Sequence, residues 1–272
     1  MLQRGLSAAV LIPIVVFFAY QGGFLFAIGI GLVAALALNE FFKMLSRQGD
    51  RPLRVLGGGA TALLIINGLN IGDTETVAQA AIALLVFGGL LWELASYQED
   101  RNLRGWALTI AGVFYIGWPL GLVVALRGLG DERTGFWWLV TMALGIWACD
   151  TGAYVIGRFL GGRFSGDRKF SPRWSPNKTW EGFFGGVLTC LLVTTALATS
   201  QLGLPIWKAA LLGLILGPTA VFGDLAESMV KRNVGVKDSG DLIPGHGGML
   251  DRVDSILFGA VIVYFFARWL VY

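Results

Sequence analysis

The chain has 272 residues, of which 55% are hydrophobic and only 14% are charged, and its mean hydropathy is +0.67. Soluble globular domains carry about 25% charged residues, so this composition excludes a soluble fold and makes the lipid bilayer the expected solvent. The net charge of +3 is small, and the two cysteines, Cys149 and Cys190, form neither a disulfide framework nor a metal-ligand spacing.

Apolar runs along the chain predict an all-α, polytopic membrane protein with about nine spans, since a helix needs about 20 apolar residues to cross the hydrocarbon core. The predicted spans are 6–20, 23–42, 55–71, 77–95, 106–126, 135–156, 182–200, 207–224 and 253–271. The first run follows Arg4 as a leader peptide would, but no small-x-small cleavage site follows it, so we expect it to be retained. The run at 55–71 is the poorest match, because it is rich in glycine and contains Asn67 and Asn70.

Basic residues predict the orientation of these spans, because Lys and Arg accumulate in cytoplasmic loops. The N-terminus and alternate connecting segments hold 17 of the 21 Lys and Arg residues. These connecting segments are 43–54, 96–105, 157–181 and 225–252. We therefore expect a cytoplasmic N-terminus, an external C-terminus, an N-terminal transmembrane region over 1–130, and a catalytic transmembrane region over 131–272. The two long polar loops of the second region, 157–181 and 225–252, would face the cytoplasm.

The polar segment from Phe222 to Asp254 carries the strongest indication of chemistry. Asp224 ends one apolar run, and Asp251 and Asp254 begin the next, positions at which carboxylates are costly and commonly functional. Asp251 and Asp254 are three residues apart and would share one helix face. Together with Asp224 they would form an all-oxygen pocket suited to a hard cation such as Mg²⁺, whereas zinc would want cysteines or a histidine cluster.

Positive charge accompanies these acids in the same segment. The basic residues are Lys231, Arg232, Lys237 and Arg252. A site in which carboxylates hold a metal and cations neutralise phosphate fits a nucleotide–metal complex. The turn Pro244–Gly248 would let backbone N–H groups approach a phosphate closely. His246 is the only histidine in the chain, and it would serve as a general base, a phosphate donor or a turn-stabilising residue.

The second polar segment places Asp150 at the end of an apolar stretch and runs through Ser175–Gly182 into the next predicted span. Ser175 or Asn177 would cap that helix, and Lys178 would present a cation to an anionic ligand near its N-terminus. Trp174 and Trp180 suit the membrane–water interface as anchors.

The segment from Ser228 to Asp254 resembles the signature of the phosphatidate cytidylyltransferases, also called CDP-diacylglycerol synthases, of bacterial type. The matching pattern is Ser228-x-Val230-Lys231-Arg232-x4-Lys237-Asp238-x-Gly240-x2-Ile243-Pro244-x-His246-Gly247-Gly248-Met249-x-Asp251-Arg252-Val253-Asp254. The stretches Asp150–Tyr154 and Ser175–Gly182 also resemble family elements. For the N-terminal half, the resemblance rests on length and hydropathy alone.

This resemblance implies a membrane enzyme that joins CTP and phosphatidate to give CDP-diacylglycerol and pyrophosphate. It implies Mg²⁺, with K⁺ as a partner ion, held by Asp224 and Asp251. From its place beside Asp251, we expect Asp254 to be a further ligand or a group that supports the ligands. The resemblance also implies a homodimer in the bacterial inner membrane, with the active site facing the cytoplasm and no nucleic-acid partner. The residues that the resemblance and the charge pattern assign to catalysis are Asp224, Lys231, Arg232, Lys237, Asp251 and Arg252. Those assigned to substrate binding are Asp150, Lys178, Ser228, His246, Gly247 and Gly248.

Two other functions remain open at this point. A CTP-dependent polyprenol or dolichol kinase would transfer a phosphoryl group rather than a nucleotidyl group. An anion transporter would use some of the 39 glycines to break its helices around a transport path. Transporters usually contain an internal sequence repeat, and this sequence shows no convincing one. The same glycines are more typical of close helix packing through small residues.

Overall fold

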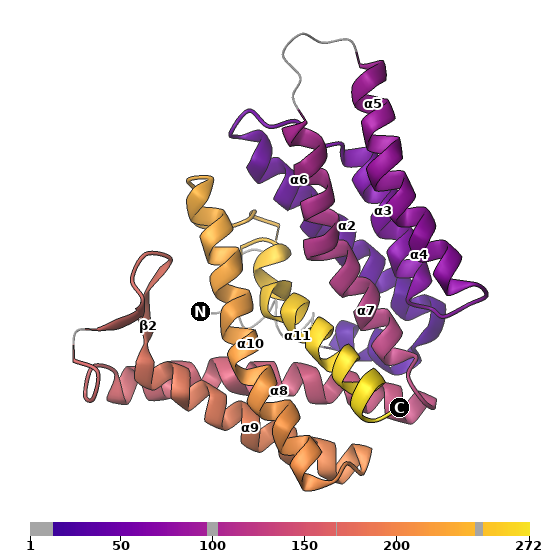
Figure 1. Cartoon of the computed structure of the whole chain (residues 1–272). Coiled ribbons are helices and arrows are strands. Elements are labelled where there is room, and N and C mark those ends of the chain that lie inside the picture. Colours follow the sequence, from indigo (N-terminus) through magenta and orange to yellow (C-terminus); the bar gives the residue numbers. More distant parts are fainter. Residues whose placement is uncertain (1–12, 97–102, 167, 243–246) are drawn as a thin grey trace. The chain divides into compact units, whose positions relative to one another are not determined.

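The computed structural model describes residues 13–96, 103–166, 168–242 and 247–272. The elements of this described part are helices and one two-stranded hairpin, and the chain divides into two compact units that are described separately (Figure 1). Unit 1 comprises 1–128 and 233–252, and unit 2 comprises 129–232 and 253–272.

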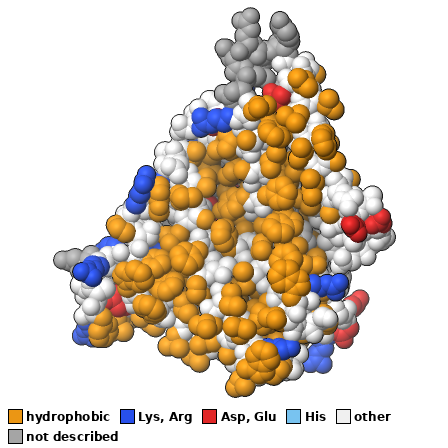
Figure 2. All heavy atoms as spheres, viewed as in Figure 1, with side chains coloured by type: hydrophobic (Ala, Val, Ile, Leu, Met, Phe, Trp, Pro, Cys, Tyr) orange, Lys and Arg blue, Asp and Glu red, His pale blue; other side chains and the backbone are white. Residues whose placement is uncertain are grey.

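Seven helices in the described part of the chain are long and apolar enough to cross a membrane. They are Gly23–Ser46, Thr74–Ala95, Arg104–Arg127, Glu132–Leu160, Trp180–Leu202, Ile206–Asn233 and Leu250–Leu270. They correspond to seven of the nine predicted spans. The prediction at 55–71 meets a helix of only 14 residues, Arg54–Asn67. Of the prediction at 6–20, residues 6–12 lie outside the described part of the chain, and residues 13–20 are helical. Hydrophobic side chains cover most of the face seen in Figure 2, as expected for helices solvated by lipid.

Unit 1 contains α2 (Gly23–Ser46), α3 (Arg54–Asn67), and two helices that are each interrupted by a π-helical turn. The first runs through α4 (Thr74–Ala83), η1 (Leu84–Gly88) and α5 (Gly89–Ala95). The second runs through α6 (Arg104–Gly112), η2 (Val113–Gly117) and α7 (Trp118–Arg127). The Trp106 indole N–H donates to the Leu85 carbonyl within the first π turn, at 2.9 Å. The wider turn therefore has a side-chain donor for its carbonyl.

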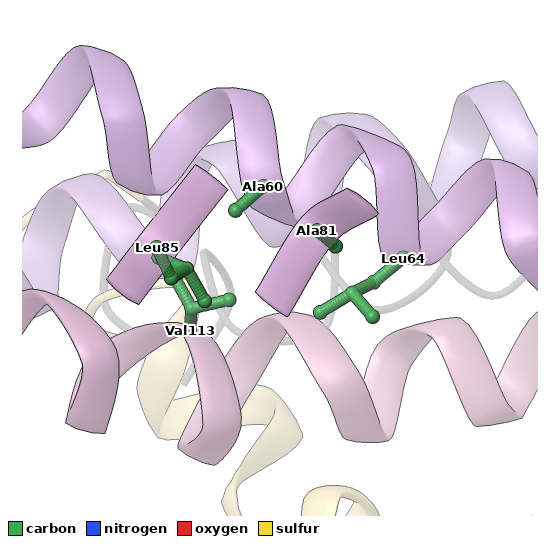
Figure 3. Packing of buried hydrophobic residues seen from close by; sticks show 5 residues of the cluster. All are labelled: Ala60, Leu64, Ala81, Leu85 and Val113. Carbon is green, nitrogen blue, oxygen red and sulfur yellow. The ribbon is translucent and has the colours of Figure 1, made fainter. Parts of the chain in front are cut away.

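The core of unit 1 forms where α3 packs against both interrupted helices. Ala60 and Leu64 of α3, Ala81 of α4, Leu85 of η1 and Val113 of η2 make one buried cluster (Figure 3). Glycines of the α6–η2–α7 helix allow this approach. A Cβ on Gly105 would lie 2.3 Å from the Arg51 carbonyl, and one on Gly121 would lie 2.6 Å from the Leu64 carbonyl. The residues from Arg51 to Leu64 therefore run alongside the residues from Gly105 to Gly121.

The polar connections of unit 1 gather at one end of its helices. The Arg104 guanidinium lies 2.9 Å from Asp50, and the Gln48 side-chain amide donates to the Val234 carbonyl at 3.0 Å. At the opposite end, Arg127 donates to the carbonyls of Ala19 and Tyr20 at 2.7 and 2.9 Å. The loop after α2, the start of α6 and the 233–252 segment thus share one end of the unit.

Unit 2 contains α8 (Glu132–Leu160), the hairpin β1 (Lys169–Ser171) and β2 (Ser175–Thr179), and α9 (Trp180–Leu202). It also contains most of α10 (Ile206–Asn233) and α11 (Leu250–Leu270). The antiparallel hairpin pairs Lys169 with Thr179 and Ser171 with Ser175. The Lys208 ammonium donates to the Leu270 carbonyl at 2.5 Å, which joins the beginning of α10 to the end of α11.

Aspartates at the N-caps of two helices begin their first turns. Asp73 accepts from the Thr76 amide at 3.1 Å, and Asp131 accepts from the Thr134 amide at 2.7 Å. The pKa of each carboxyl is lowered, first by the hydroxyl of the same threonine and then by its amide. Both caps are therefore ionised in the folded chain at neutral pH.

Candidate functional site

Asp251, the predicted metal ligand of the signature segment, is held by its own loop in unit 1. Its Oδ2 accepts from the Ser239 amide at 3.0 Å, the Ser239 hydroxyl at 2.9 Å and the Gly248 amide at 2.8 Å. Three donors on one oxygen fix the orientation of the carboxylate. A cation would consequently have to bind Asp251 through Oδ1.

The two glycines of the signature are required by close approach to these groups. Gly247 has a φ of +78°, and a Cβ on it would lie 2.7 Å from Asp251 Oδ2. A Cβ on Gly248 would lie 2.1 Å from the Ser239 hydroxyl. Sequence reasoning assigned the N–H groups of this turn to a phosphate, but the Gly248 N–H is donated to Asp251. Gly248 therefore donates a hydrogen bond to the Asp251 carboxylate, and Gly247 leaves the space that this carboxylate occupies. His246 lies outside the described residues.

Glu40 of α2 also contacts this loop, and sequence reasoning missed it. Its carboxylate accepts from the Ser239 hydroxyl at 3.0 Å and from the amides of Met249 and Leu250 at 2.9 Å each. The side chain is buried. The available signal was a carboxylate inside the apolar run 23–42, because ionisable residues at such depth are functional candidates.

In unit 2, Asp224 and Lys178 form an ion pair. Lys178 of β2 places its ammonium 2.7 Å from Asp224 Oδ2 and 3.4 Å from the Val221 carbonyl, both on α10. The Ser228 hydroxyl, one turn along α10, donates to Asp224 Oδ1 at 3.4 Å. The predicted cation of the 157–181 loop therefore meets the predicted metal ligand at the end of the neighbouring span.

Asp150 and Asp254 lie near this ion pair. Asp150 of α8 is within electrostatic range of Asp254, Asp224 and Lys178. The backbone of α11 at Asp254 packs closely on α10, since a Cβ on Gly223 would lie 3.0 Å from the Asp254 carbonyl. Unit 2 therefore brings four of the predicted residues into one neighbourhood. These residues are Asp150, Lys178, Asp224 and Asp254.

The predicted aspartates do not form a complete metal-binding site within the part of the chain that the structure describes. No group of three His, Cys, Asp or Glu side chains in those parts lies close enough to hold an ion. Asp224 and Asp254 belong to unit 2 and Asp251 to unit 1, so the predicted three-aspartate set is a property of neither unit alone.

The predicted phosphate-binding cations differ in their surroundings. Lys231 is buried on α10 and pairs with Glu227, one helical turn earlier, at 2.8 Å. Arg232, Lys237 and Arg252 are exposed. The charge of Lys231 is therefore balanced within its own helix, and the exposed three present their charge at the surface of their units.

The hairpin fixes the position of Lys178, and it corrects one prediction. Thr179 caps α9 by accepting from the Gly182 amide at 3.1 Å, whereas Ser175 and Asn177, the predicted caps, lie in β2. Phe170 of β1 stacks on Phe183 with ring centroids 4.7 Å apart and meets the edge of Trp180 at 4.8 Å. These ring contacts attach the hairpin to the first turn of α9.

Comparison with known proteins shows the family to which the chain belongs. The model of the cytidylyltransferase family matches residues 2–270. A phosphatidate cytidylyltransferase of Synechocystis sp. is 34% identical over 291 residues, covering 97% of this chain and 95% of the relative. The enzyme of the same name from Brucella suis is 36% identical over 269 residues, covering 97% and 92%. That from Bacillus subtilis is 32% identical over 279 residues, covering 97% of each. The chain belongs to the cytidylyltransferase family.

Proposed function

We propose that this multi-pass membrane protein transfers CMP from CTP to phosphatidate, giving CDP-diacylglycerol and pyrophosphate. The observation that carries this proposal is the match to phosphatidate cytidylyltransferases over nearly the whole of both chains. The signature loop, built around Asp251, supports it from the structure.

The reaction needs charge neutralisation and alignment more than a protein nucleophile. A phosphate oxygen of phosphatidate forms a bond to the α-phosphorus of CTP, and the bond from that phosphorus to the oxygen of the β-phosphate breaks. Pyrophosphate leaves with the electron pair of that bond. Exposed Arg232, Lys237 and Arg252 would neutralise the triphosphate and the lipid phosphate, and Lys178 would contribute from the hairpin.

A divalent cation fits the donor set of this chain. Asp224, Asp251 and Asp254 offer only carboxylate oxygens, which Mg²⁺ prefers. The 2.7 Å contact of Lys178 with Asp224 is consistent with a position that attracts positive charge. Asp224 and Asp251 would hold Mg²⁺, Asp254 would support it, and K⁺ would be the second ion. Such an ion, when bound, neutralises the charge that develops on the departing pyrophosphate.

The placement of the polar ends supports an active site facing the cytoplasm. In unit 1 the loop after α2, the start of α6 and the 233–252 segment share one end, and these are segments rich in Lys and Arg. The positive-inside tendency places that end in the cytoplasm, where CTP is available. We extend the proposal to the inner membrane of a bacterial cell and, from the family resemblance, to a homodimer.

The position of the transferred label tests the proposal. Full-length protein in detergent–lipid micelles with phosphatidate and Mg²⁺ would be given CTP labelled at either the α- or the γ-phosphate. We expect the lipid to carry label only from the α-position and the γ-label to appear in pyrophosphate. Lipid labelled from the γ-position would identify a kinase instead. No labelled lipid from folded protein, with anion uptake into vesicles, would identify a transporter.

A further inference from the structure

Glu40 has no part in the chemistry proposed above, yet its carboxylate is buried on an apolar helix, where a charged group is costly. It lies on α2, a 24-residue apolar helix, with 7% of its surface exposed. A buried carboxylate is strongly destabilising unless hydrogen-bond donors surround it. Its three donors all come from the signature loop, 199 to 210 residues away in the chain.

Two of these donors are the backbone N–H groups at the beginning of α11. The helix starts at Leu250, so the amides of Met249 and Leu250 have no partner within the helix. An acidic group at this end also interacts favourably with the helix dipole. Glu40 therefore caps α11 from a different helix, and it fixes where the first turn, with Asp251, begins.

The third donor links Glu40 to Asp251. The Ser239 hydroxyl oxygen lies 3.0 Å from Glu40 Oε2 and 2.9 Å from Asp251 Oδ2. A hydroxyl has a single proton, so this serine is shared between the two carboxylates. Gly248 adds a steric link, because a Cβ at that position would lie 2.1 Å from the Ser239 hydroxyl and 2.4 Å from Glu40 Oε2.

We propose that Glu40 is a positioning residue for the cation site: it fixes Ser239 and the first turn of α11, and through them the orientation of Asp251. The inference rests on the proposed role of Asp251 as a cation ligand. Groups that hold a metal ligand in place commonly change metal affinity or activity 10- to 100-fold when they are removed. Loss of Glu40 should therefore weaken cation binding while leaving contacts to the nucleotide in place.

The test compares Glu40→Gln, which keeps the side-chain volume, with Asp50→Asn in the full-length protein. Asp50 is a matched control, because its carboxylate is also buried in unit 1 but pairs with Arg104. Direct Mn²⁺ binding would be followed by electron paramagnetic resonance, and the exchange of the amides of 247–251 by hydrogen–deuterium exchange. CDP-diacylglycerol formation would be measured over a range of Mg²⁺ concentrations.

For Glu40→Gln we expect an Mn²⁺ dissociation constant about tenfold higher, with an equal rise in half-saturating Mg²⁺. We also expect faster amide exchange at 247–251 and a lower kcat, with the KM for CTP unchanged. Asp50→Asn should change none of these. If Glu40→Gln lowers only the melting temperature and binds Mn²⁺ as the unmodified protein does, the positioning role is wrong. If the unmodified protein makes no CDP-diacylglycerol but Glu40→Gln still weakens Mn²⁺ binding, the proposed reaction fails and the positioning role stands.

Discussion

Glu40 in unit 1 and Glu181 in unit 2 are both buried, and each accepts hydrogen bonds from two backbone amides and one serine hydroxyl. Glu40 accepts from two backbone amides and the hydroxyl of Ser239. Glu181 accepts from the amides of Phe164 and Ser165 at 3.0 and 2.7 Å, and from the Ser165 hydroxyl at 3.0 Å. Each carboxylate thus orders a polar turn at the end of an apolar helix.

The two turns differ in how far the hydrogen-bond partners lie along the chain and in whether they also contact a proposed metal ligand. The partners of Glu181 are only 16 and 17 residues away, and they close the turn between α8 and the hairpin. The partners of Glu40 are about 200 residues away, and one of them, Ser239, also binds Asp251. One arrangement closes a local turn, whereas the other joins a distant helix to a proposed metal ligand. We therefore expect substitutions at Glu40 or its hydrogen-bond donors to lower catalytic activity. Substitutions at Glu181 or its donors should mainly lower stability.

The largest effect in this comparison is expected from Gly248→Ala. The added methyl would lie 2.1 Å from the Ser239 hydroxyl and 2.4 Å from Glu40 Oε2, so the loop must shift. Overpacking of this kind costs roughly 1–3 kcal/mol, which corresponds to a loss of about 5- to 150-fold in kcat if the full cost falls on the position of Asp251 in the transition state. Gly58→Ala in α3 is the control, because its Cβ would meet no heavy atom within 4 Å. Equal kcat values for the two variants would show that the loop adapts without moving Asp251.

A smaller effect is expected from Lys178→Gln, which removes the ammonium beside Asp224 in unit 2. Loss of one charged hydrogen-bond partner, moderated by partial exposure, should reduce kcat/KM for CTP about tenfold. Lys169→Gln, at the exposed first residue of strand β1 in the same hairpin, should stay close to the unmodified protein. The kcat/KM for CTP of both variants would be measured over a range of salt concentrations. If the two variants give the same values throughout, Lys178 is not part of the site.

The smallest catalytic effect is expected from Glu181→Gln. An uncharged acceptor weakens the hydrogen bonds from Phe164 and Ser165, so thermal unfolding should occur at a lower temperature. Half-saturating Mg²⁺ should stay within about twofold of the unmodified value, in contrast to the tenfold rise expected for Glu40→Gln. A matching rise for both glutamates would mean that the two groups do not differ in function.

Much of the fold could be predicted because lipid imposes simple rules. Seven predicted spans coincide with helices of sufficient length and hydropathy. The span predicted at 55–71 proved to be the shorter helix Arg54–Asn67. The π-helical turns could not be predicted, since no local pattern in the sequence marks them. The hairpin Lys169–Thr179 was missed for a related reason. Its strands are short and polar, and ring contacts of Phe170 with Phe183 and Trp180 hold it in place.

In the candidate site, individual residues could likewise be predicted from local sequence patterns, whereas contacts between distant residues could not. The signature pattern and the charge pattern named Asp224, Asp251 and Lys178 directly from the sequence. Contact between Lys178 and Asp224 was not visible there, because the two residues lie on separate elements 46 positions apart. The partners of Glu40 could not be predicted for the same reason, since nothing local to α2 indicates that they are Ser239, Met249 and Leu250.

The most direct test of the account is the formation of CDP-diacylglycerol from labelled CTP by the full-length protein and by Asp251→Asn, with and without Mg²⁺. An amide at this position keeps the size of the side chain but loses its charge and one acceptor oxygen. We expect Mg²⁺-dependent product from the unmodified protein and a loss of roughly a thousandfold in the variant, because a bound metal supplies several kcal/mol of transition-state stabilisation. The melting temperature of each protein shows that both are folded. Undiminished, Mg²⁺-dependent product from folded Asp251→Asn would contradict the central role of this carboxylate.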